Sequence, residues 1–291
     1  MPTVMQESVS DSDAEKILEI LNSLGEFLWE RLWRDDMAIP SNLNVNAKEE
    51  EERELILRYL LMRVALNQQG NSLKIRQFAS ELVEKLGKEF LIRPLEFLSD
   101  PKVYDEILSI AQKYGGSKGS DLYSPGRLGG IKPFYITISR LSLFALFIRF
   151  LARQKTSLIK LLKGIIKSEE SVLQLNNWLM NERCINLAWV GRDPKASRML
   201  TDWIIFIWAR IWKEAPLISP HLMQKTIMIV DGHVGKVFSR TGILKKVVYE
   251  SKRPYIIEAS KMRPWIEEIV NAVSMRKGCL LYTSPSPRDR G

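Results

Sequence analysis

The chain has 291 residues, of which 45% are hydrophobic and 26% charged, with a formal net charge of +9. This composition is typical of a soluble globular protein and excludes a fibrous or wholly disordered chain. Residues 1–54 contain fourteen acidic and five basic side chains, so the remainder is strongly basic. A chain this basic is typical of a protein that binds a polyanion. The alternatives are a basic protein that is merely soluble and one that binds an anionic membrane surface.

The last thirteen residues, 279–291 (CLLYTSPSPRDRG), read like the translation of a sequencing-library adapter, and we treat them as a non-native tail. Without them only one cysteine remains, Cys184, so no disulfide framework is predicted. The two histidines, His221 and His233, are too few to build a metal site, and none is predicted in this chain. The first fifteen residues are polar and acidic, unlike a signal peptide. We therefore expect an intracellular protein, in the cytoplasm or nucleoid.

The expected elements begin after residues 1–13, which we expect to be disordered. Apolar residues recur at helical spacing over 17–32, and a loop with Pro40 then leads to the acidic run 48–54. We expect this run to be the solvated first turn of a helix that continues to residue 66. Further helical patterns occupy residues 73–86, 103–113, 135–154, 158–166, 170–180, 196–213, 232–241 and 255–274.

Strand-like alternation is nearly absent, so the predicted fold class is all-α. The most apolar stretches, 141–151 and 199–212, are shorter than a membrane span and are interrupted or flanked by Arg149, Asp202 and Arg210. They are therefore predicted to be core helices, and no membrane association is expected. The tryptophans of the second stretch are predicted to lie in the core, at positions Trp203, Trp208 and Trp212.

Chemistry is concentrated in two segments, the first of which is 187–196 (LAWVGRDPKA). Gly191 can supply a tight turn between two helical patterns. Backbone N–H groups at the start of the following helix, with Arg192, Lys195 and Arg198 nearby, would suit a phosphate group. The alternative is a plain helix-turn-helix corner.

The second segment is 229–242 (IVDGHVGKVFSRTG), in which Asp231 precedes a helical pattern. Taken alone, an aspartate in this place is most simply a helix cap. Lys236 and Arg240 could hold DNA phosphates, or they could belong to a solvated helix face. His233 is expected to pack or orient its neighbours and not to bind a ligand.

Three segments together resemble the helix-hairpin-helix DNA glycosylase superfamily, which includes endonuclease III and the adenine and 8-oxoguanine glycosylases. Residues 66–69 (LNQQ) are similar to a helix end with a paired-glutamine loop, and VGR at 190–192 with Lys195-Ala196 is similar to the LPGVGRKTA hairpin. The stretch 230–241 is similar to the helix that begins with the superfamily's aspartate. The order is the same, and the resemblance covers roughly residues 50–250.

The hairpin also departs from the superfamily's pattern. Ala188-Trp189 replace the usual Pro-Gly, and Asp193-Pro194 add two residues before the lysine. The interval from Lys195 to Asp231 is longer than in endonuclease III and is more like that of the archaeal 8-oxoguanine glycosylases. The third segment is therefore the best match.

The resemblance implies two helical lobes with a DNA-binding cleft between them. The central lobe would comprise residues 50–222 with the hairpin near 187–196, and the second lobe residues 14–49 plus 223–278. The partner would be double-stranded DNA with a damaged, oxidised or mismatched base, bound by a monomer. Which lesion is excised, and opposite which base, stays open.

The resemblance also implies the catalytic roles. Gln68 or Gln69 would fill the space of the flipped base, unless they form only a polar loop. Lys195 would attack the sugar and give a Schiff base with strand cleavage, unless it merely contacts phosphate as in monofunctional glycosylases. Asp231 would stabilise positive charge on the sugar and assist proton transfer.

Other readings of the chain remain open. Relatives that carry a 4Fe–4S cluster hold it by four cysteines beyond the aspartate, about where residues 279–291 begin, so such a cluster in the natural C-terminus is left open. Two rivals to the glycosylase are a non-catalytic helical DNA-binding protein that keeps the hairpin and a helical protein-interaction scaffold. The scaffold would place Lys195 far from Asp231.

Overall fold

The computed structural model describes residues 37–66, 72–115, 134–165 and 207–212, together with a few isolated positions: Asp13, Lys16, Ile17, Glu19, Ile20, Leu200, Trp203 and Ile204. Contacts between Cα atoms divide the chain into two units, Met1–Trp33 with Ser219–Pro287 and Arg34–Ile218 with Arg288–Gly291. Nearly all described residues belong to the second unit. The predicted limits of the two lobes stay predictions.

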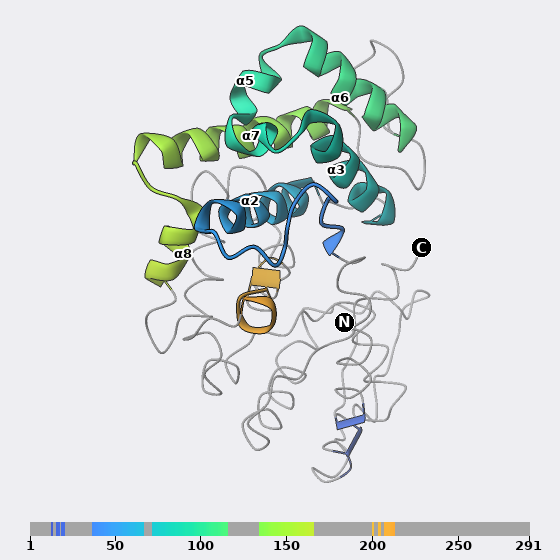
Figure 1. Cartoon of the computed structure of the whole chain (residues 1–291). Helices are drawn as coiled ribbons and strands as arrows, with labels where there is room; N and C mark the ends of the chain where they lie inside the picture. The colour runs from blue at the N-terminus through green and yellow to red at the C-terminus, as the bar shows by residue number, and fades with distance from the viewer. Residues whose placement is uncertain are drawn as a thin grey trace, which may run out of the picture. The chain divides into compact units, whose positions relative to one another are not determined.

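The described part of the chain is mostly helical and contains no strand, as the predicted all-α class requires. The predicted helices 73–86, 103–113, 135–154 and 158–166 are confirmed to within two residues at each end, whereas the short α4 and α5 were not predicted. Figure 1 shows the order of the helices, which are α2 (Glu50–Leu66), α3 (Ser72–Leu86), α4 (Glu89–Ile92), α5 (Pro94–Leu98), α6 (Pro101–Lys113), α7 (Phe134–Arg153), α8 (Leu158–Ile165) and a π-helix (Ile207–Ile211).

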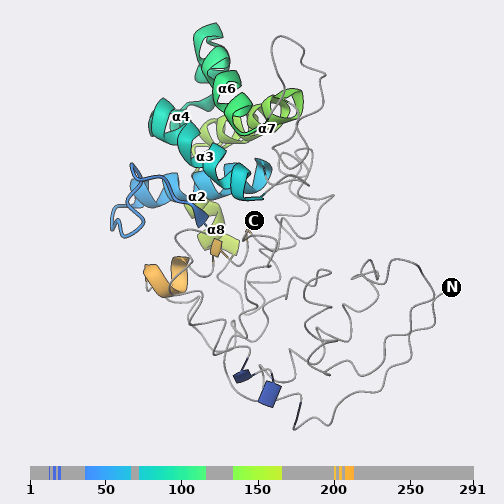
Figure 2. The ribbon, with the colours of Figure 1, turned by 90° about the vertical axis from the view of Figure 1, so that its right-hand side faces the viewer.

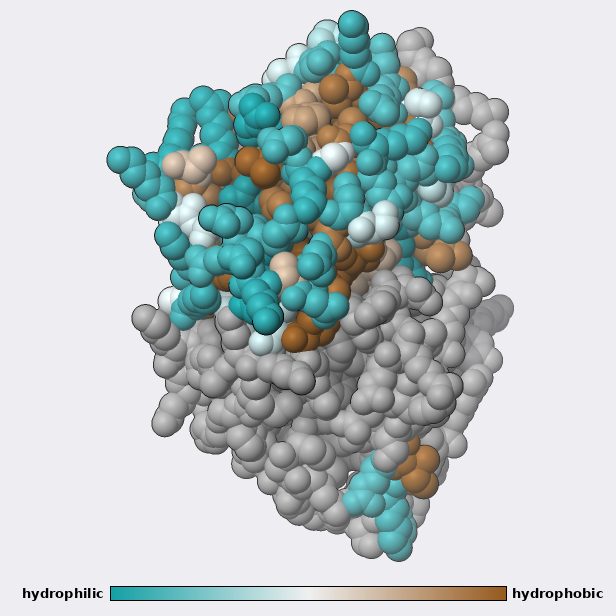
Figure 3. All heavy atoms as spheres, viewed as in Figure 1, coloured by the Kyte–Doolittle hydropathy of each residue, from teal (hydrophilic) through white to brown (hydrophobic). Residues whose placement is uncertain are grey.

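Helix α2 is the central element of the described unit. Twelve of its 17 residues are buried, and it contacts α3, α4, α7 and α8. Apolar side chains from Leu55 to Leu66 surround the helix on nearly all sides, which is the pattern of a helix inside a core. On the face drawn in Figure 3 the described residues are mainly hydrophilic, with apolar side chains visible between them.

Helix α7 packs against both α2 (Figures 1 and 2) and α5 (Figure 1). Its length and composition would allow it to cross a membrane, a test that core helices of soluble proteins also pass. Eight of its residues are buried, from Phe134 to Leu151. The prediction of a core helix over 141–151 is therefore confirmed.

The helix ends follow familiar local rules. The Asp100 side chain caps α6 by accepting a hydrogen bond from the Lys102 N–H at 2.9 Å, directly before Pro101. The C-terminal turn of α7 is closed by Lys155, whose φ of 50° lies in the left-handed region that glycine usually occupies. The Thr156 N–H donates to the Leu151 carbonyl at 3.1 Å, which completes this cap.

Residues 37–49 pack against α2 and α3. The Tyr59 hydroxyl donates to the Ala38 carbonyl, and burial raises the pKa of Tyr59 above its usual range. The Asn42 amide donates to the Val83 carbonyl at 3.0 Å, and the Arg53 Nε donates to the Ala47 carbonyl at 2.9 Å. Tyr59 and Arg53 thus satisfy two carbonyl groups of a segment that has no regular helix of its own, and Asn42 joins the segment to α3.

A polar network joins α3 to α6. Glu81 Oε2 accepts hydrogen bonds from Lys113 Nζ at 2.6 Å and from the Tyr114 hydroxyl at 2.5 Å, and Lys85 Nζ lies 3.5 Å from Oε1. Burial acts to raise the pKa of Glu81, but the hydrogen bonds from Lys113 and Tyr114 outweigh it, so the pKa is lowered. The ionised carboxylate therefore stabilises the folded state.

This network predicts a particular acid sensitivity. Because the folded-state pKa of Glu81 lies below its ordinary value of 4.5, its contribution is complete above that value and is lost as the pH falls through the folded pKa. We expect Glu81→Gln to lower the free energy of unfolding at neutral pH and to lose this effect in acid. Urea unfolding across the pH range measures the difference, with the exposed Glu106→Gln as control. A Glu81→Gln effect that is constant with pH would contradict the prediction.

Candidate functional site

The residues predicted to carry out chemistry or bind DNA lie outside the described residues. These are Gln68, Gln69, Gly191, Arg192, Lys195, Arg198, Asp231, Lys236 and Arg240. Their roles therefore stay predictions, and so does the distance between Lys195 and Asp231. The structure does describe parts of the chain near two of these groups in sequence, namely α2 before the glutamines and, after the lysine, Leu200, Trp203, Ile204 and residues 207–212.

The described residues Leu200, Trp203, Ile204 and 207–212 fall within the stretch predicted to be helical, 196–213. The last turn is a π-helix, because the Trp212 N–H donates to the Ile207 carbonyl five residues before it, at 2.8 Å. Trp212 is also fixed from outside, because its Nε1 donates to the Val45 carbonyl at 3.0 Å. The prediction that the three tryptophans are core residues is confirmed, with Trp203 and Trp208 each 2% exposed and Trp212 7% exposed.

Two arginine–tryptophan stacks attach this segment to α2. The Arg63 guanidinium carbon lies 4.2 Å from the centre of the Trp203 ring, and that of Arg53 lies 4.9 Å from the Trp212 ring. Arg53 is near the start of α2 and Arg63 near its end, about 15 Å further along the helix axis. Since the later tryptophan meets the earlier arginine, the segment runs antiparallel to α2.

This antiparallel arrangement places Trp203 against the end of α2 that precedes the predicted glutamine loop in the sequence. Arg63 is five residues before Gln68, and Trp203 is eight residues after Lys195. The stack of Arg63 on Trp203 therefore joins the helix that leads to the paired glutamines to the chain that leaves the lysine hairpin. The sequence carries no signal for this pairing, because an arginine in an apolar helix and a tryptophan 140 residues later show no shared pattern.

The same end of α2 holds buried positive charge. Arg63 is 3% exposed, and Arg76 on α3 is 7% exposed, so buried cations occur on both helices that flank residues 67–71. A buried guanidinium loses its hydration, and the face of an indole ring replaces part of it through the negative charge of the π system. The interaction of Arg63 with Trp203 is therefore expected to be stronger than an exposed pair of the same kind.

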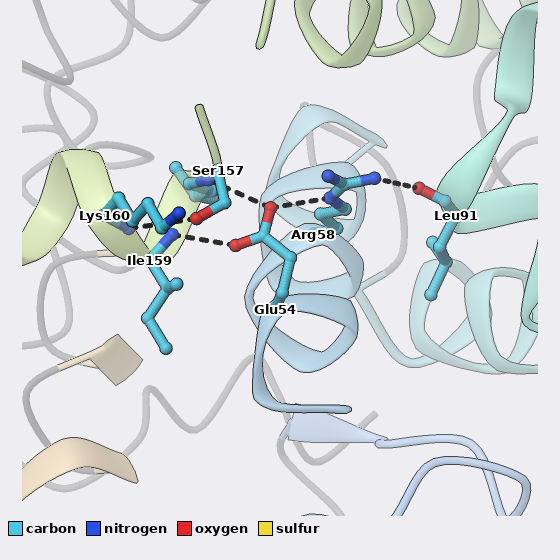
Figure 4. Close-up of polar contacts among 7 residues, drawn as sticks. Glu54, Arg58, Leu91, Ser157, Ile159 and Lys160 are labelled. Carbon is cyan, nitrogen blue, oxygen red and sulfur yellow. Dashed lines mark hydrogen bonds and ion pairs between the residues drawn. The ribbon is translucent and has the colours of Figure 1, made fainter. Parts of the chain in front are cut away.

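A second polar centre lies at the other end of α2, where Figure 4 shows the Glu54 carboxylate facing the start of α8. Glu54 Oε1 accepts hydrogen bonds from the Leu158 N–H at 2.9 Å and from Arg58 Nε at 2.7 Å, and Oε2 accepts one from the Ile159 N–H at 2.8 Å. Arg58 Nη1 donates in turn to the Leu91 carbonyl at 3.1 Å. One buried side chain thus connects α2, α8 and α4.

This polar centre has a structural role. Glu54 gives the first N–H groups of α8 the acceptor that a helix start lacks, and its negative charge faces the positive end of the helix dipole. Both oxygens are engaged with protein donors, so the carboxylate is held as a clamp and not presented to a substrate. The expectation that all of residues 48–54 are solvated is wrong at Glu54, which is 7% exposed, because α8 covers that side of α2.

No metal or cofactor site emerges from the described residues, among which no three His, Cys, Asp or Glu side chains group together. The glycosylases that carry a 4Fe–4S cluster hold it by four cysteines. The chain contains two cysteines, Cys184 and Cys279, and both lie outside the described residues. A cluster in the natural C-terminus therefore stays an open question.

The chain was compared with models of protein families, with curated proteins and with solved structures, and none of them matches. The resemblance to the glycosylases thus depends on the three short segments of the sequence. A function for the chain has to be argued from those segments and from the arrangement around α2.

We predict that Glu54→Gln lowers the free energy of unfolding by about 2–4 kcal/mol, because an amide removes one acceptor and the charge that holds Arg58 and the start of α8. The matched control is Glu50→Gln, which removes an exposed ion pair with Lys163 at 2.9 Å and should cost no more than about 1 kcal/mol. Urea unfolding followed by circular dichroism measures both. Equal losses would contradict a clamp at Glu54.

The two arginine–tryptophan stacks predict a difference in coupling energy. A double-mutant cycle with Arg63→Ala and Trp203→Leu should give a coupling of about 1–2 kcal/mol, because both side chains are buried. The cycle with Arg53→Ala and Trp212→Leu is the control and should give about half of that, since Arg53 is only partly buried. A larger coupling at Arg53 than at Arg63 would overturn this ranking.

Proposed function

We propose that the protein is a base-excision-repair DNA glycosylase with an accompanying lyase step, which removes an oxidised or mismatched base from double-stranded DNA. The observation that carries this proposal is the order of its motifs: a paired-glutamine loop, a hairpin followed by Lys195, and a helix start at Asp231 with His233. The two-lobed arrangement with a DNA-binding cleft belongs to the same proposal.

The arrangement around α2 supports the proposal. A glycosylase must bring the residues that fill the vacated space in the duplex near those that attack the sugar, because both act on one flipped nucleotide. The Arg63–Trp203 stack holds the helix before Gln68 against the chain after Lys195. If Trp203 instead contacted the start of α2, far from the glutamines, a single active site would be much harder to reconcile with the fold.

In the proposed mechanism the Lys195 amine attacks the anomeric carbon C1′ while the bond from C1′ to the base breaks. The base leaves with the bonding electron pair and takes up a proton. Neighbouring positive charge from Arg192 and Arg198 favours the neutral, nucleophilic form of the amine. Asp231 stabilises the positive charge that develops on the sugar and assists proton transfer.

The lyase step follows from the covalent intermediate. Opening of the sugar ring leaves an imine between Lys195 Nζ and C1′, and loss of a proton from C2′ allows elimination of the 3′ phosphate. Water then hydrolyses the imine and frees the enzyme. A monofunctional glycosylase would use water in place of Lys195, and a non-catalytic DNA-binding protein would keep only the phosphate contacts of the hairpin.

Borohydride trapping tests the proposal, because it reduces the imine to a stable amine and leaves protein and DNA covalently joined. The substrates are duplexes that contain 8-oxoguanine, uracil, an oxidised pyrimidine or a mismatch. We expect base release and a trapped complex with at least one of them, loss of trapping in Lys195→Ala, and a loss of base release of at least about a hundredfold in Asp231→Asn.

The control variant is Lys102→Ala, which removes an exposed lysine on α6 and should leave both activities unchanged. Base release without trapping would identify the monofunctional mechanism. Absence of both for every substrate would refute the enzyme and favour the DNA-binding alternative if undamaged duplex is still bound. Absence of all DNA binding would favour the protein-interaction scaffold.

A further inference from the structure

The positive charge of the protein is concentrated in one stretch of the chain. The 47 residues from Leu122 to Ser168 contain nine lysines and arginines and no aspartate or glutamate. The rest of the chain holds 34 basic and 34 acidic residues, so this stretch accounts for the entire net charge of +9. Its described part is α7, the turn after it, and α8.

One face of α7 is exposed and combines basic with apolar side chains. Leu146, Arg149, Phe150 and Arg153 are spaced by three and four residues, so they lie on one side of the helix. All four are exposed, Leu146 by 49% and Phe150 by 37%. The exposed Lys155 follows in the turn, and we call these five residues the α7 basic face.

The cations of the α7 basic face are available to a partner. Among the residues that the structure describes, no carboxylate pairs with Arg149, Arg153 or Lys155, whereas Lys163 of α8 pairs with Glu50. The Phe150 ring lies almost parallel to the buried Phe147 ring, with 6.4 Å between centres and 25° between planes. This packing restrains an aromatic ring within a group of free cations.

The α7 basic face also lies away from the end of α2 that leads to the paired glutamines. The turn from α7 leads directly into α8, whose first N–H groups bind Glu54 near the start of α2 (Figures 1 and 4). Leu66, after which the glutamines follow, is about 18 Å further along the helix. The turn that follows the face is therefore near the opposite end of α2 from Leu66.

From this charge and this mixture of side chains, we propose that the α7 basic face binds a single-stranded segment of nucleic acid, with Arg149, Arg153 and Lys155 on its phosphates and Phe150 stacked on an unpaired base. Phosphates can pair with the three cations, for which the described residues offer no carboxylate. An exposed aromatic ring between cations is a surface on which an unpaired base can stack. A bilayer surface would engage Leu146 and Phe150 by insertion instead. The proposal does not depend on Lys195 or Asp231.

The test measures binding of a fluorescein-labelled thymidine oligonucleotide by fluorescence anisotropy over a series of salt concentrations. The test variant is Arg149→Gln/Arg153→Gln/Lys155→Gln. The control variant is Lys85→Gln/Arg93→Gln/Lys102→Gln, which loses the same charge from α3, α6 and the α4–α5 junction, where two of the three cations already pair with glutamates. Urea midpoints and circular dichroism establish that each variant is folded.

We expect the test variant to bind more weakly than the control and to reduce the slope of log affinity against log salt by about 2, since each phosphate contact on a single strand contributes about 0.7. Phe150→Ala should weaken oligonucleotide binding by about 5- to 100-fold and affect a duplex of the same length less. The oligonucleotide carries no lesion and the assay does not read base release, so failure of the glycosylase proposal and failure of this one are distinguishable.

Three results would overturn the proposal: no binding of the oligonucleotide by the wild-type chain, equal losses in the two triple variants, or equal losses of Phe150→Ala on single strand and duplex. A parallel experiment uses vesicles of equimolar phosphatidylcholine and phosphatidylserine. If the test variant loses vesicle binding while oligonucleotide binding is unchanged, the face is a membrane-surface site and not a nucleic-acid site.

Discussion

The arrangement of the described helices depends on the burial of α2 from Glu54 to Leu66. A helix that is apolar on nearly every side needs neighbours all round it, and α3, α4, α7 and α8 supply them. Glu54 and Arg63 are its buried charged residues, and burial of Glu54 is tolerated because the start of α8 and Arg58 give its oxygens three donors. That one carboxylate ties the start of α8, and with it the chain just after the α7–α8 turn, to α2.

The two arginine–tryptophan stacks hold another part of the chain against α2, through cation–π contacts and not through hydrogen bonds. An arginine in a core helix keeps its charge, and a flat aromatic face is a neighbour that costs little to bury. Two such pairs, at Arg53 and Arg63, fix both the direction and the register of residues 203–212 against α2. One pair would fix position but not direction. For the proposed enzyme, direction matters because it decides which end of α2 the lysine hairpin is connected to.

The sequence predicted the fold where the periodicity of apolar residues extends over several turns, as in α3, α6, α7 and α8. It did not predict α4 and α5, because a helix of four or five residues is too short to show a period. It placed Glu54 in solvent because a run of acidic residues is locally typical of an exposed first turn, and only α8, about a hundred residues later, shows otherwise. The candidate site was predicted from motifs alone: Lys195 and Asp231 are named by their neighbours in sequence, whereas Arg63 and Trp203 could not be found this way, since their relation exists only in three dimensions.

Lys155 gives a last consequence of the turn between α7 and α8. An L-residue in the left-handed region costs about 1 kcal/mol relative to glycine, so the most stable chain would have glycine at this position. The protein instead has an exposed lysine at the point where the chain leaves the helix. Replacing Lys155 by glycine to raise thermal stability would therefore remove one cation of the α7 basic face.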